Sequence, residues 1–232
     1  MSNKLAIVTG GTKGIGRAII ELLAAKGFDI ATCARTYEQL LSLKQTLTAQ
    51  YGIKVHTFVA DLSDEIQVRD FCHFANSLGA PDLLVCNAAL YQTGRITEEE
   101  KPLLPRLLSA NVLSNYHLCR AVVPSMKVRK SGHIFTICSV ASVMPKPDIG
   151  SYAVSKAAVY SLTQNLREEL KHFGIKVTAI LPGATLTASW DDEPNKPDNI
   201  LSAKDVADSL WAAYNLSANA CPDEIRLSPL NF

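Results

Sequence analysis

The chain lacks paired cysteines and an excess of either charge, and both absences narrow its function. Its six cysteines are scattered over 232 residues without a C-x-x-C pair, and several lie in apolar runs, where a thiol packs as a small hydrophobic group. We therefore expect no structural zinc or other metal and a reduced, cytoplasmic protein. A net charge of +1 gives no reason to expect a nucleic-acid or membrane partner.

Long apolar runs are also missing. No run reaches the roughly 18–20 residues that cross a bilayer, and the start, Met1-Ser2-Asn3-Lys4, leads into a short apolar run and glycines rather than a signal peptide. The length and a hydrophobic content of 47% fit one domain with a sizeable core, over residues 1–232.

Short apolar runs alternate with longer segments of helical periodicity. Predicted strands cover residues 5–9, 28–34, 54–60, 82–86, 133–139, 176–181 and 224–227. Predicted helices cover residues 17–26, 37–50, 64–78 (with Ser63 as N-cap), about 103–123, 152–173 and 203–214. This alternation predicts an α/β fold with a doubly wound parallel sheet of about seven strands and helices on both faces.

The sequence TGGTKGIG at residues 9–16 joins the first predicted strand to the first helix. Glycines let the backbone approach a pyrophosphate closely, and a helix N-terminus supplies free N–H groups and partial positive charge. The spacing is G-x-x-x-G-x-G rather than the commoner G-x-G-x-x-G. By itself it is compatible with a simple tight turn, but its position between strand and helix predicts dinucleotide binding by Gly10, Thr12, Lys13, Gly14, Ile15 and Gly16.

The end of the second predicted strand indicates which dinucleotide. NAD-binding sheets usually place a carboxylate there for the ribose 2′-hydroxyl, whereas this strand ends Cys33-Ala34-Arg35-Thr36. Arg35 can pair with a 2′-phosphate, and Lys13 adds a second positive charge. The alternative is two solvated surface cations. With the acid missing, we predict NADP(H).

Tyr152 and Lys156 are four residues apart in a predicted helix and so share one face. A phenol with a pKa near 10 is a poor acid–base group at neutral pH, and a nearby ammonium lowers that pKa toward the useful range. A Tyr–Lys pair alone is more often part of an exposed helix face. Its value here depends on the other motifs of the chain.

Those motifs are Thr9 to Gly16, Asp61-Leu62, Cys86-Asn87-Ala88-Ala89, Asn111, Ser139, Tyr152-x-x-x-Lys156 and Pro182-Gly183. In order and spacing they resemble the short-chain dehydrogenase/reductase family from about Leu5 to Leu227, most of all its compact NADPH-dependent carbonyl reductases. The resemblance implies a Rossmann-type sheet and an NADP-dependent oxidoreductase that reduces a carbonyl to an alcohol by hydride transfer.

The resemblance also implies a catalytic role for four residues. Tyr152 protonates the carbonyl oxygen, and Ser139 hydrogen-bonds the same oxygen. Lys156 lowers the Tyr152 pKa and holds the nicotinamide ribose, while Asn111 supports a water chain from Lys156.

Further cofactor contacts are implied along the chain. Asp61 matches the residue that binds the adenine amino group, and Asn87 lies in the segment that lines the cofactor. The full implied set, beside the glycine turn, is Arg35, Asp61, Leu62, Asn87, Ala88, Tyr152, Lys156, Pro182, Gly183, Thr185 and Thr187.

Two departures from the family bear on function. The usual Asn-Asn-Ala-Gly segment has Cys86 and Ala89 as its first and last members. The stretch at residues 188–200 is short for a substrate loop, so the pocket is expected to be thinly covered. Residues 183–199 form either a lid or an ordinary surface loop.

Candidate pocket residues flank the catalytic ones and are mostly apolar: Leu90, Tyr91, Val140, Ala141, Met144, Ile149 and Trp190. They suit a small ketone, a dicarbonyl or a pterin-like compound, and the chain end at residues 224–229 is similar to bacterial sepiapterin-reductase-like members. One alternative is 3-oxoacyl-carrier-protein reduction, with a carrier docked on Lys127, Arg129, Lys130 and Lys171. Another is a catalytically silent NADP-binding regulator. The resemblance further implies a homodimer or homotetramer.

Overall fold

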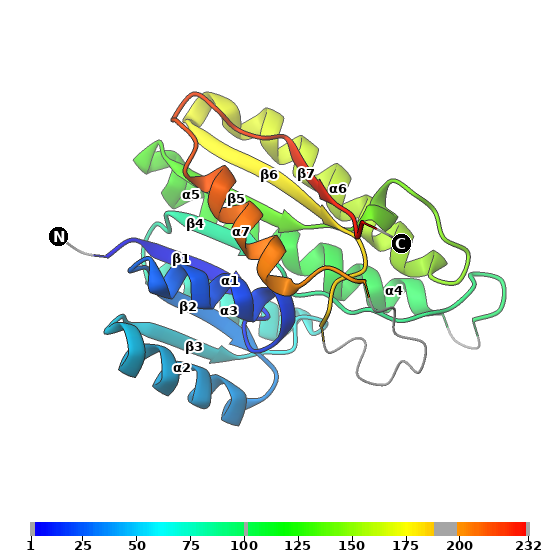
Figure 1. Ribbon diagram of the computed structural model, residues 1–232, viewed down its shortest axis with the longest axis horizontal. Helices are drawn as coiled ribbons and strands as arrows, with labels where there is room; N and C mark the ends of the chain where they lie inside the picture. The colour runs from blue at the N-terminus through cyan, green and yellow to red at the C-terminus, as the bar shows by residue number, and fades with distance from the viewer. Residues whose placement is uncertain (1–2, 100–101, 188–198, 231–232) are drawn as a thin grey trace.

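Seven parallel strands form the centre of the computed structural model, which describes residues 3–99, 102–187 and 199–230 (Figure 1). The strand order is β3-β2-β1-β4-β5-β6-β7. The strands are β1 (Leu5–Thr9), β2 (Asp29–Ala34), β3 (Val55–Val59), β4 (Leu83–Cys86), β5 (Gly132–Ile137), β6 (Ile175–Pro182) and β7 (Glu224–Leu227). The doubly wound, Rossmann-type prediction is confirmed.

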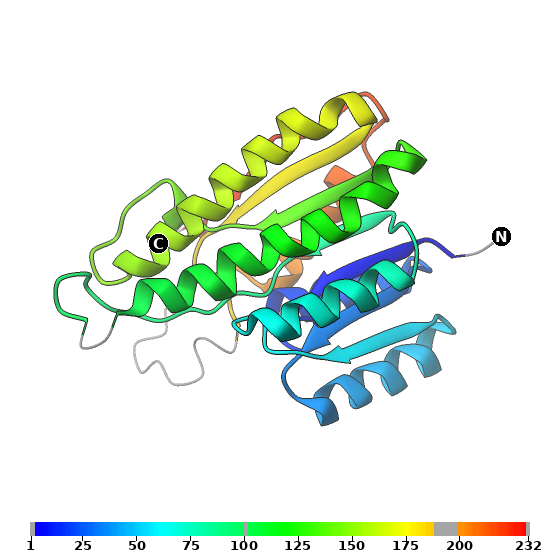
Figure 2. The ribbon, with the colours of Figure 1, turned by 180° about the vertical axis from the view of Figure 1, so that it is seen from behind.

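Helices cover both faces of this sheet. The α-helices are α1 (Gly14–Ala25), α2 (Tyr37–Tyr51), α3 (Glu65–Ser77), α4 (Leu103–Leu108), α5 (Ser114–Arg129), α6 (Gly150–Leu170) and α7 (Ala203–Tyr214). Helices α1, α2 and α7 lie in front in Figure 1, and α3, α5 and α6 lie in front in the reverse view of Figure 2. Two large cores, one on each face, result from this arrangement.

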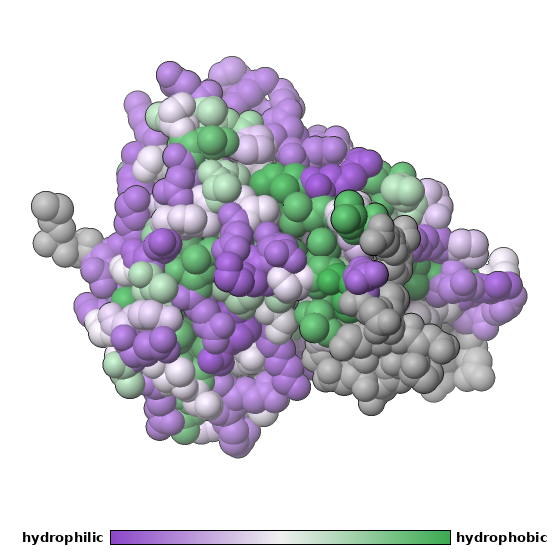
Figure 3. Space-filling view, viewed as in Figure 1, coloured by the Kyte–Doolittle hydropathy of each residue, from purple (hydrophilic) through white to green (hydrophobic). Residues whose placement is uncertain are grey.

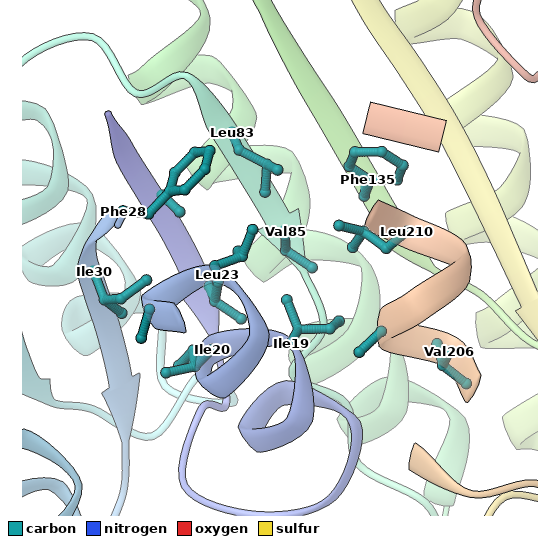
Figure 4. Packing of buried hydrophobic residues seen from close by; sticks show 14 of the residues in the cluster. Ile19, Ile20, Leu23, Phe28, Ile30, Leu83, Val85, Phe135, Val206 and Leu210 are labelled. Carbon is teal, nitrogen blue, oxygen red and sulfur yellow. The ribbon is translucent and has the colours of Figure 1, made fainter. Parts of the chain in front are cut away.

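In the core beneath α1 and α7, buried side chains of the two helices pack against the sheet. Ile19 and Leu23 of α1 and Leu210 of α7 point toward Val85 and Phe135 of the sheet (Figure 4). All five side chains are fully buried, and each such side chain contributes roughly 1.5–3 kcal/mol when it leaves water. Because the central strands β1, β4 and β5 are buried along almost their whole length, both faces of the sheet need a helical cover.

The ends of several elements differ from the predictions. Ser63 does not cap α3: the Asp64 carboxylate accepts from the backbone N–H groups of Ile66 and Gln67, at 2.9 and 3.1 Å. The Ser63 hydroxyl instead donates to Asp61 at 2.8 Å. An aspartate one residue later therefore provides the cap, as its charge favours.

The predicted helix at 103–123 is longer and less regular than expected. It continues to Arg129, past Pro124, and between α4 and α5 it contains a π-helical turn, η1 (Ser109–Leu113). In contrast, β5 ends at Ile137 instead of residue 139, because Ser139 caps the short 3₁₀ helix η2 (Val140–Ser142) through the Ala141 N–H. Within the described residues, no helix is both long and apolar enough to span a membrane.

Candidate active site

The glycine turn between β1 and α1 depends on its glycines for two different reasons. Gly10 and Gly14 have positive φ angles of 68° and 54°, which side chains disfavour. Gly11 and Gly16 have no room for a side chain: a Cβ on Gly16 would lie 2.3 Å from the Gly10 carbonyl oxygen, and one on Gly11 2.3 Å from Thr32 Oγ1. Gly11 and Gly16 are thus required by close contacts within the protein, independently of any bound cofactor.

The start of α1 is arranged to receive an anion. Thr12 is half-buried and Lys13 is exposed at the N-cap position. The Lys13 ammonium has no acceptor with which to cap the helix, so this N-cap residue leaves the N–H groups at the helix start available to a phosphate. Gly14, Ile15 and Gly16 form the first turn. The turn therefore fits the pyrophosphate of a dinucleotide.

Asn87 fastens the end of β4 to this turn. Its Nδ2 donates to the carbonyl oxygens of Thr9 and Gly10, at 2.9 and 3.3 Å. The backbone N–H groups of Asn87 and Ala88 both donate to Thr9 Oγ1, at 3.0 and 2.9 Å. Asn87 thus holds the shape of the turn, and Ala88 lies against Gly10.

The predicted adenosine end lies at the tips of β2 and β3. Burial would raise the pKa of Asp61, but hydrogen bonds from Ser63 and the charges of Arg35 and Arg106 outweigh it and lower that pKa below its ordinary value. Arg35 is exposed, and Leu62 packs against the core. Arg106 is a residue that the sequence did not single out, because it lies on a helix in no motif.

The segment after β6 reaches the same place from the other side. Gly183 N–H donates to Leu227 O at 2.7 Å, extending the pairing of β6 with β7 past Pro182. Thr185 is buried, and its hydroxyl donates to Gly183 O at 3.0 Å. A Cβ on Gly14 would lie 3.0 Å from Thr187 Cγ2. Thr187 therefore borders the glycine turn; Trp190 and residues 188–198 lie outside the described residues.

Asn111 connects the other predicted catalytic segments. It is buried in η1, its Oδ1 accepts from Leu90 N–H at 2.7 Å, and its Nδ2 donates to Leu90 O at 3.0 Å. Nδ2 also donates to Ser155 Oγ on α6 at 2.9 Å. Ser155, which lies inside the Tyr-x-x-x-Lys motif, was missed at the sequence level although its position there pointed to it.

Ser139, Tyr152 and Lys156 lie together beyond the carboxyl end of β5. Burial raises the pKa of Tyr152, and a hydrogen bond with the Ser139 hydroxyl partly offsets this. Lys156 is buried; its Nζ donates to Ile137 O at 2.7 Å and lies 5.8 Å from the centre of the Tyr152 ring. Burial lowers the Lys156 pKa to about 8. The two side chains share a helix face as expected, while the lowering of the Tyr152 pKa by Lys156 stays a prediction.

An apolar hollow of about 810 Å³ lies near these residues but faces away from them. It is lined on α6 by Gly150, Ala153, Val154 and Ala157 and opposite by Ile96, Ala141 and Val143, among others. At 100° per residue these α6 positions face away from Tyr152 and Lys156. Of the predicted pocket residues, Ala141 lines this hollow.

The surface around the strand ends is hydrophobic. Figure 3 shows hydrophobic residues gathered near the ends of β6 and β7. Exposed apolar side chains there and nearby include Leu186, Met144 and Tyr91. Over the described residues, no group of three or more His, Cys, Asp or Glu side chains could hold a metal ion. The site's donors are thus hydroxyls, amides and cations suited to a dinucleotide and a polar organic group.

Comparison with known proteins agrees with this geometry. The family model described as short chain dehydrogenase matches residues 4–198. An uncharacterised oxidoreductase of Staphylococcus saprophyticus is 29% identical over 231 residues, which are 99% of both chains.

Solved structures extend the likeness to three dimensions. An alcohol dehydrogenase from the archaeon Thermococcus sibiricus, complexed with 5-hydroxy-NADP, is 25% identical with a TM-score of 0.91 and covers 100% of this chain and 98% of its own. A short-chain dehydrogenase from Sphingobium yanoikuyae in complex with NADPH is 26% identical, has a TM-score of 0.87 and covers 99% and 89%. Both complexes are in line with the predicted NADP(H). The chain is an oxidoreductase that belongs to the short-chain dehydrogenase/reductase family.

Proposed function

We propose that the protein is an NADPH-dependent carbonyl reductase. The observation that carries the proposal is the grouping of Ser139, Tyr152 and Lys156 at the carboxyl end of β5, with Asn111 joined to the same helix through Ser155. Ligands bind at this edge of open α/β sheets. The preference for NADPH over NADH is supported by Arg35, by Lys13 and by the NADP complexes of the neighbours.

In this proposal NADPH, when bound, supplies the hydride. Tyr152 Oη delivers a proton to the carbonyl oxygen, and Ser139 Oγ donates a hydrogen bond that orients it. Lys156, with a pKa of about 8, is largely protonated at neutral pH, so its positive charge favours the phenolate that Tyr152 becomes. The Ile137 carbonyl, which accepts from Nζ at 2.7 Å, holds that charge on the phenol's side of α6.

The substrate we propose is a small ketone, a dicarbonyl or a pterin-like compound, as in sepiapterin-reductase-like enzymes. Half-exposed aromatic and apolar side chains near Tyr152 support it. The carrier-protein alternative is less favoured: Lys127 pairs with Glu169 at 2.9 Å, Lys171 pairs with Glu168, and Arg129 approaches Asp82 at 3.6 Å. Cations already matched to carboxylates attract an acidic partner weakly. The silent regulator is disfavoured because all four catalytic residue types are present.

We also propose that the protein is a cytoplasmic homodimer or homotetramer that pairs through α5 and α6. Exposed apolar side chains on or next to these helices, Leu113, Tyr116 and Val154, support the pairing, since such groups mark association sites when they lie together. All six cysteines are free thiols, as a reducing compartment permits. Light scattering tests the assembly, and a strict monomer would contradict it.

The test of the function is NADPH oxidation by purified protein with ketones, dicarbonyls and pterins. Tyr152→Phe removes the ionisable hydroxyl and is expected to lower kcat about 10²–10⁴-fold, the usual contribution of general acid catalysis. The dissociation constant for NADPH is expected to stay within about twofold. Tyr214→Phe, at the end of α7 where the ring packs on Phe28, is the matched control. A protein that binds NADPH but turns over no carbonyl compound would support the regulator instead.

A further inference from the structure

Tyr91 lies beside the proposed proton donor although it belongs to no catalytic motif. Its ring meets the Tyr152 ring edge to face, with centroids 4.9 Å apart and planes at 81°. This is a favoured geometry for aromatic pairs. Tyr91 is nevertheless 46% exposed, so only part of its ring is used in the contact. An accessible aromatic surface therefore borders the group that would protonate the substrate.

The backbone before Tyr91 is held by a buried amide. The Asn111 side chain makes two hydrogen bonds to Leu90, one to its N–H and one to its carbonyl, at 2.7 and 3.0 Å. The same amide donates to Ser155 on α6. Tyr91 thus follows directly on a residue that is fixed relative to the helix of Tyr152.

The backbone after Tyr91 is fixed as well. Gly94 N–H donates to Asp148 O at 2.8 Å, and Gly150 N–H donates to Gly94 O at 3.1 Å. Arg95 adds an ion pair to Asp148 at 2.8 Å. Because Gly150 begins α6, the segment is tied to the catalytic helix on both sides of Tyr91. A side chain held in this way can select by shape.

We propose that Tyr91 is a specificity-determining residue: its ring packs against the substituent of the substrate carbonyl and favours aryl ketones over saturated ketones of the same size. The inference rests on the proposed function and names the substrate class for it. A flat aromatic substituent contacts the Tyr91 ring with the stacking or edge geometry that a puckered saturated ring lacks. Such pairs are worth about three- to tenfold in affinity beyond the area they bury.

The experiment compares acetophenone with cyclohexyl methyl ketone, two ketones of the same carbon skeleton with an aromatic and a saturated ring. The difference in reactivity between a conjugated and an unconjugated carbonyl cancels when their ratio is compared between wild type and variant. The measured quantity is the ratio of their kcat/KM values with NADPH. Tyr91→Ala is expected to reduce the wild-type ratio about three- to tenfold, mainly through KM, while Tyr91→Phe keeps it within twofold because the ring remains. Phe173→Ala, which removes an aromatic ring of similar accessibility (38% exposed) beyond the carboxyl end of α6, is expected to leave the ratio unchanged.

Two outcomes of the kinetic test would overturn the inference. In one, Tyr91→Ala lowers kcat/KM equally for both ketones, which would mean that Tyr91 acts only through Tyr152. In the other, Tyr91→Ala changes kcat/KM for neither ketone, which would mean that the substrate does not contact its ring.

A binding measurement separates this inference from the proposed function. Dissociation constants of 1-phenylethanol and 1-cyclohexylethanol are measured on protein saturated with NADP⁺. If neither ketone is reduced but Tyr91→Ala weakens the phenyl alcohol three- to tenfold more than the cyclohexyl alcohol, the proposed function fails and the role of Tyr91 stands. If wild-type protein binds neither alcohol, or both equally, the role of Tyr91 is overturned.

Discussion

Replacing His133 with glutamine is expected to make the protein more resistant to mild acid. His133 is 2% exposed in β5, and its Nε2 lies 2.8 Å from Thr178 Oγ1. The Thr178 hydroxyl donates its own hydrogen to Pro222 O at 2.7 Å, so the histidine must be the donor to Thr178. The neutral ring therefore carries its hydrogen on Nε2. Nδ1 is buried and has no hydrogen-bond partner among the described residues.

The size of the effect follows from this environment. Burial, with a smaller contribution from the Lys176 charge, lowers the His133 pKa from its ordinary 6.5 to about 3. As the pH falls below 6.5, the unfolded chain takes up the proton and the folded protein does not. His133 therefore does not reduce the free energy of unfolding above pH 6.5, and it reduces that free energy progressively as the pH falls from 6.5 toward 3. Near pH 5 the loss is about 2 kcal/mol, from 1.5 pH units at 1.36 kcal/mol each.

The assay is urea unfolding near pH 8 and near pH 5, followed by circular dichroism and linear extrapolation. In His133→Gln the amide keeps a donor near Thr178 but binds no proton, so its stability should fall about 2 kcal/mol less between the two pH values than that of wild type. His172→Gln, at an exposed position, is the control and should behave as wild type. Equal decreases in the free energy of unfolding in wild type and His133→Gln would refute the reasoning, because His133 would then bind its proton equally well in the folded and the unfolded protein.

Two further predictions concern the cofactor. Gly16→Ala should abolish measurable NADPH binding in a fluorescence titration, because its Cβ would lie 2.3 Å from the Gly10 carbonyl oxygen. The comparison is Gly27→Ala, which is strained by a φ of 80° but whose Cβ would meet nothing within 4 Å; it should lower stability and leave binding intact, and equal losses of binding would contradict the prediction. Arg35→Gln should raise the NADPH dissociation constant about 10–100-fold, the range of a charged hydrogen bond, and leave NADH within twofold. Arg69→Gln, an exposed arginine paired with Glu65, is the comparison, and an equal change for both cofactors would disprove a role in 2′-phosphate binding.

The order of strands and helices was predictable because strands that are buried on both faces are short runs of apolar residues, and these alternate with longer segments of helical periodicity. Strands β1 and β7 have the predicted ends, and α7 has both of its predicted ends. Helix starts were less predictable where glycine was involved: α1 begins at Gly14 and α6 at Gly150. Glycine has low intrinsic helix propensity, so only the packing of these turns, with Gly14 against Thr187 and Gly150 against Ile96, determines that the helices start there.

The site was predictable as a set of segments but not as a set of contacts. The motifs marked the glycine turn, Asn87 and the Tyr–Lys helix, and the structure brings these together at one edge of the sheet. The charge of Arg106 near Asp61 and the contact of Tyr91 with Tyr152 were not apparent as such. Both depend on how segments distant in sequence lie in space, and neither has a spacing rule that a single sequence reveals.

Asn111 shows how a local irregularity can serve the site. In the π-turn, two neighbouring side chains take up backbone carbonyls: Ser114 Oγ donates to Ala110 O at 2.6 Å and Asn115 Nδ2 to Asn111 O at 2.8 Å. The Asn111 amide is thus free to reach Leu90 and α6, and both hydrogens of its Nδ2 are used there. A water on the predicted path from Lys156 would therefore have to donate a hydrogen bond to an Asn111 oxygen, Oδ1 or the backbone carbonyl, because no Nδ2 hydrogen is left for it. Since π-turns recur at functional sites, we interpret this one as the feature that aligns the Tyr91 segment with the helix of Tyr152.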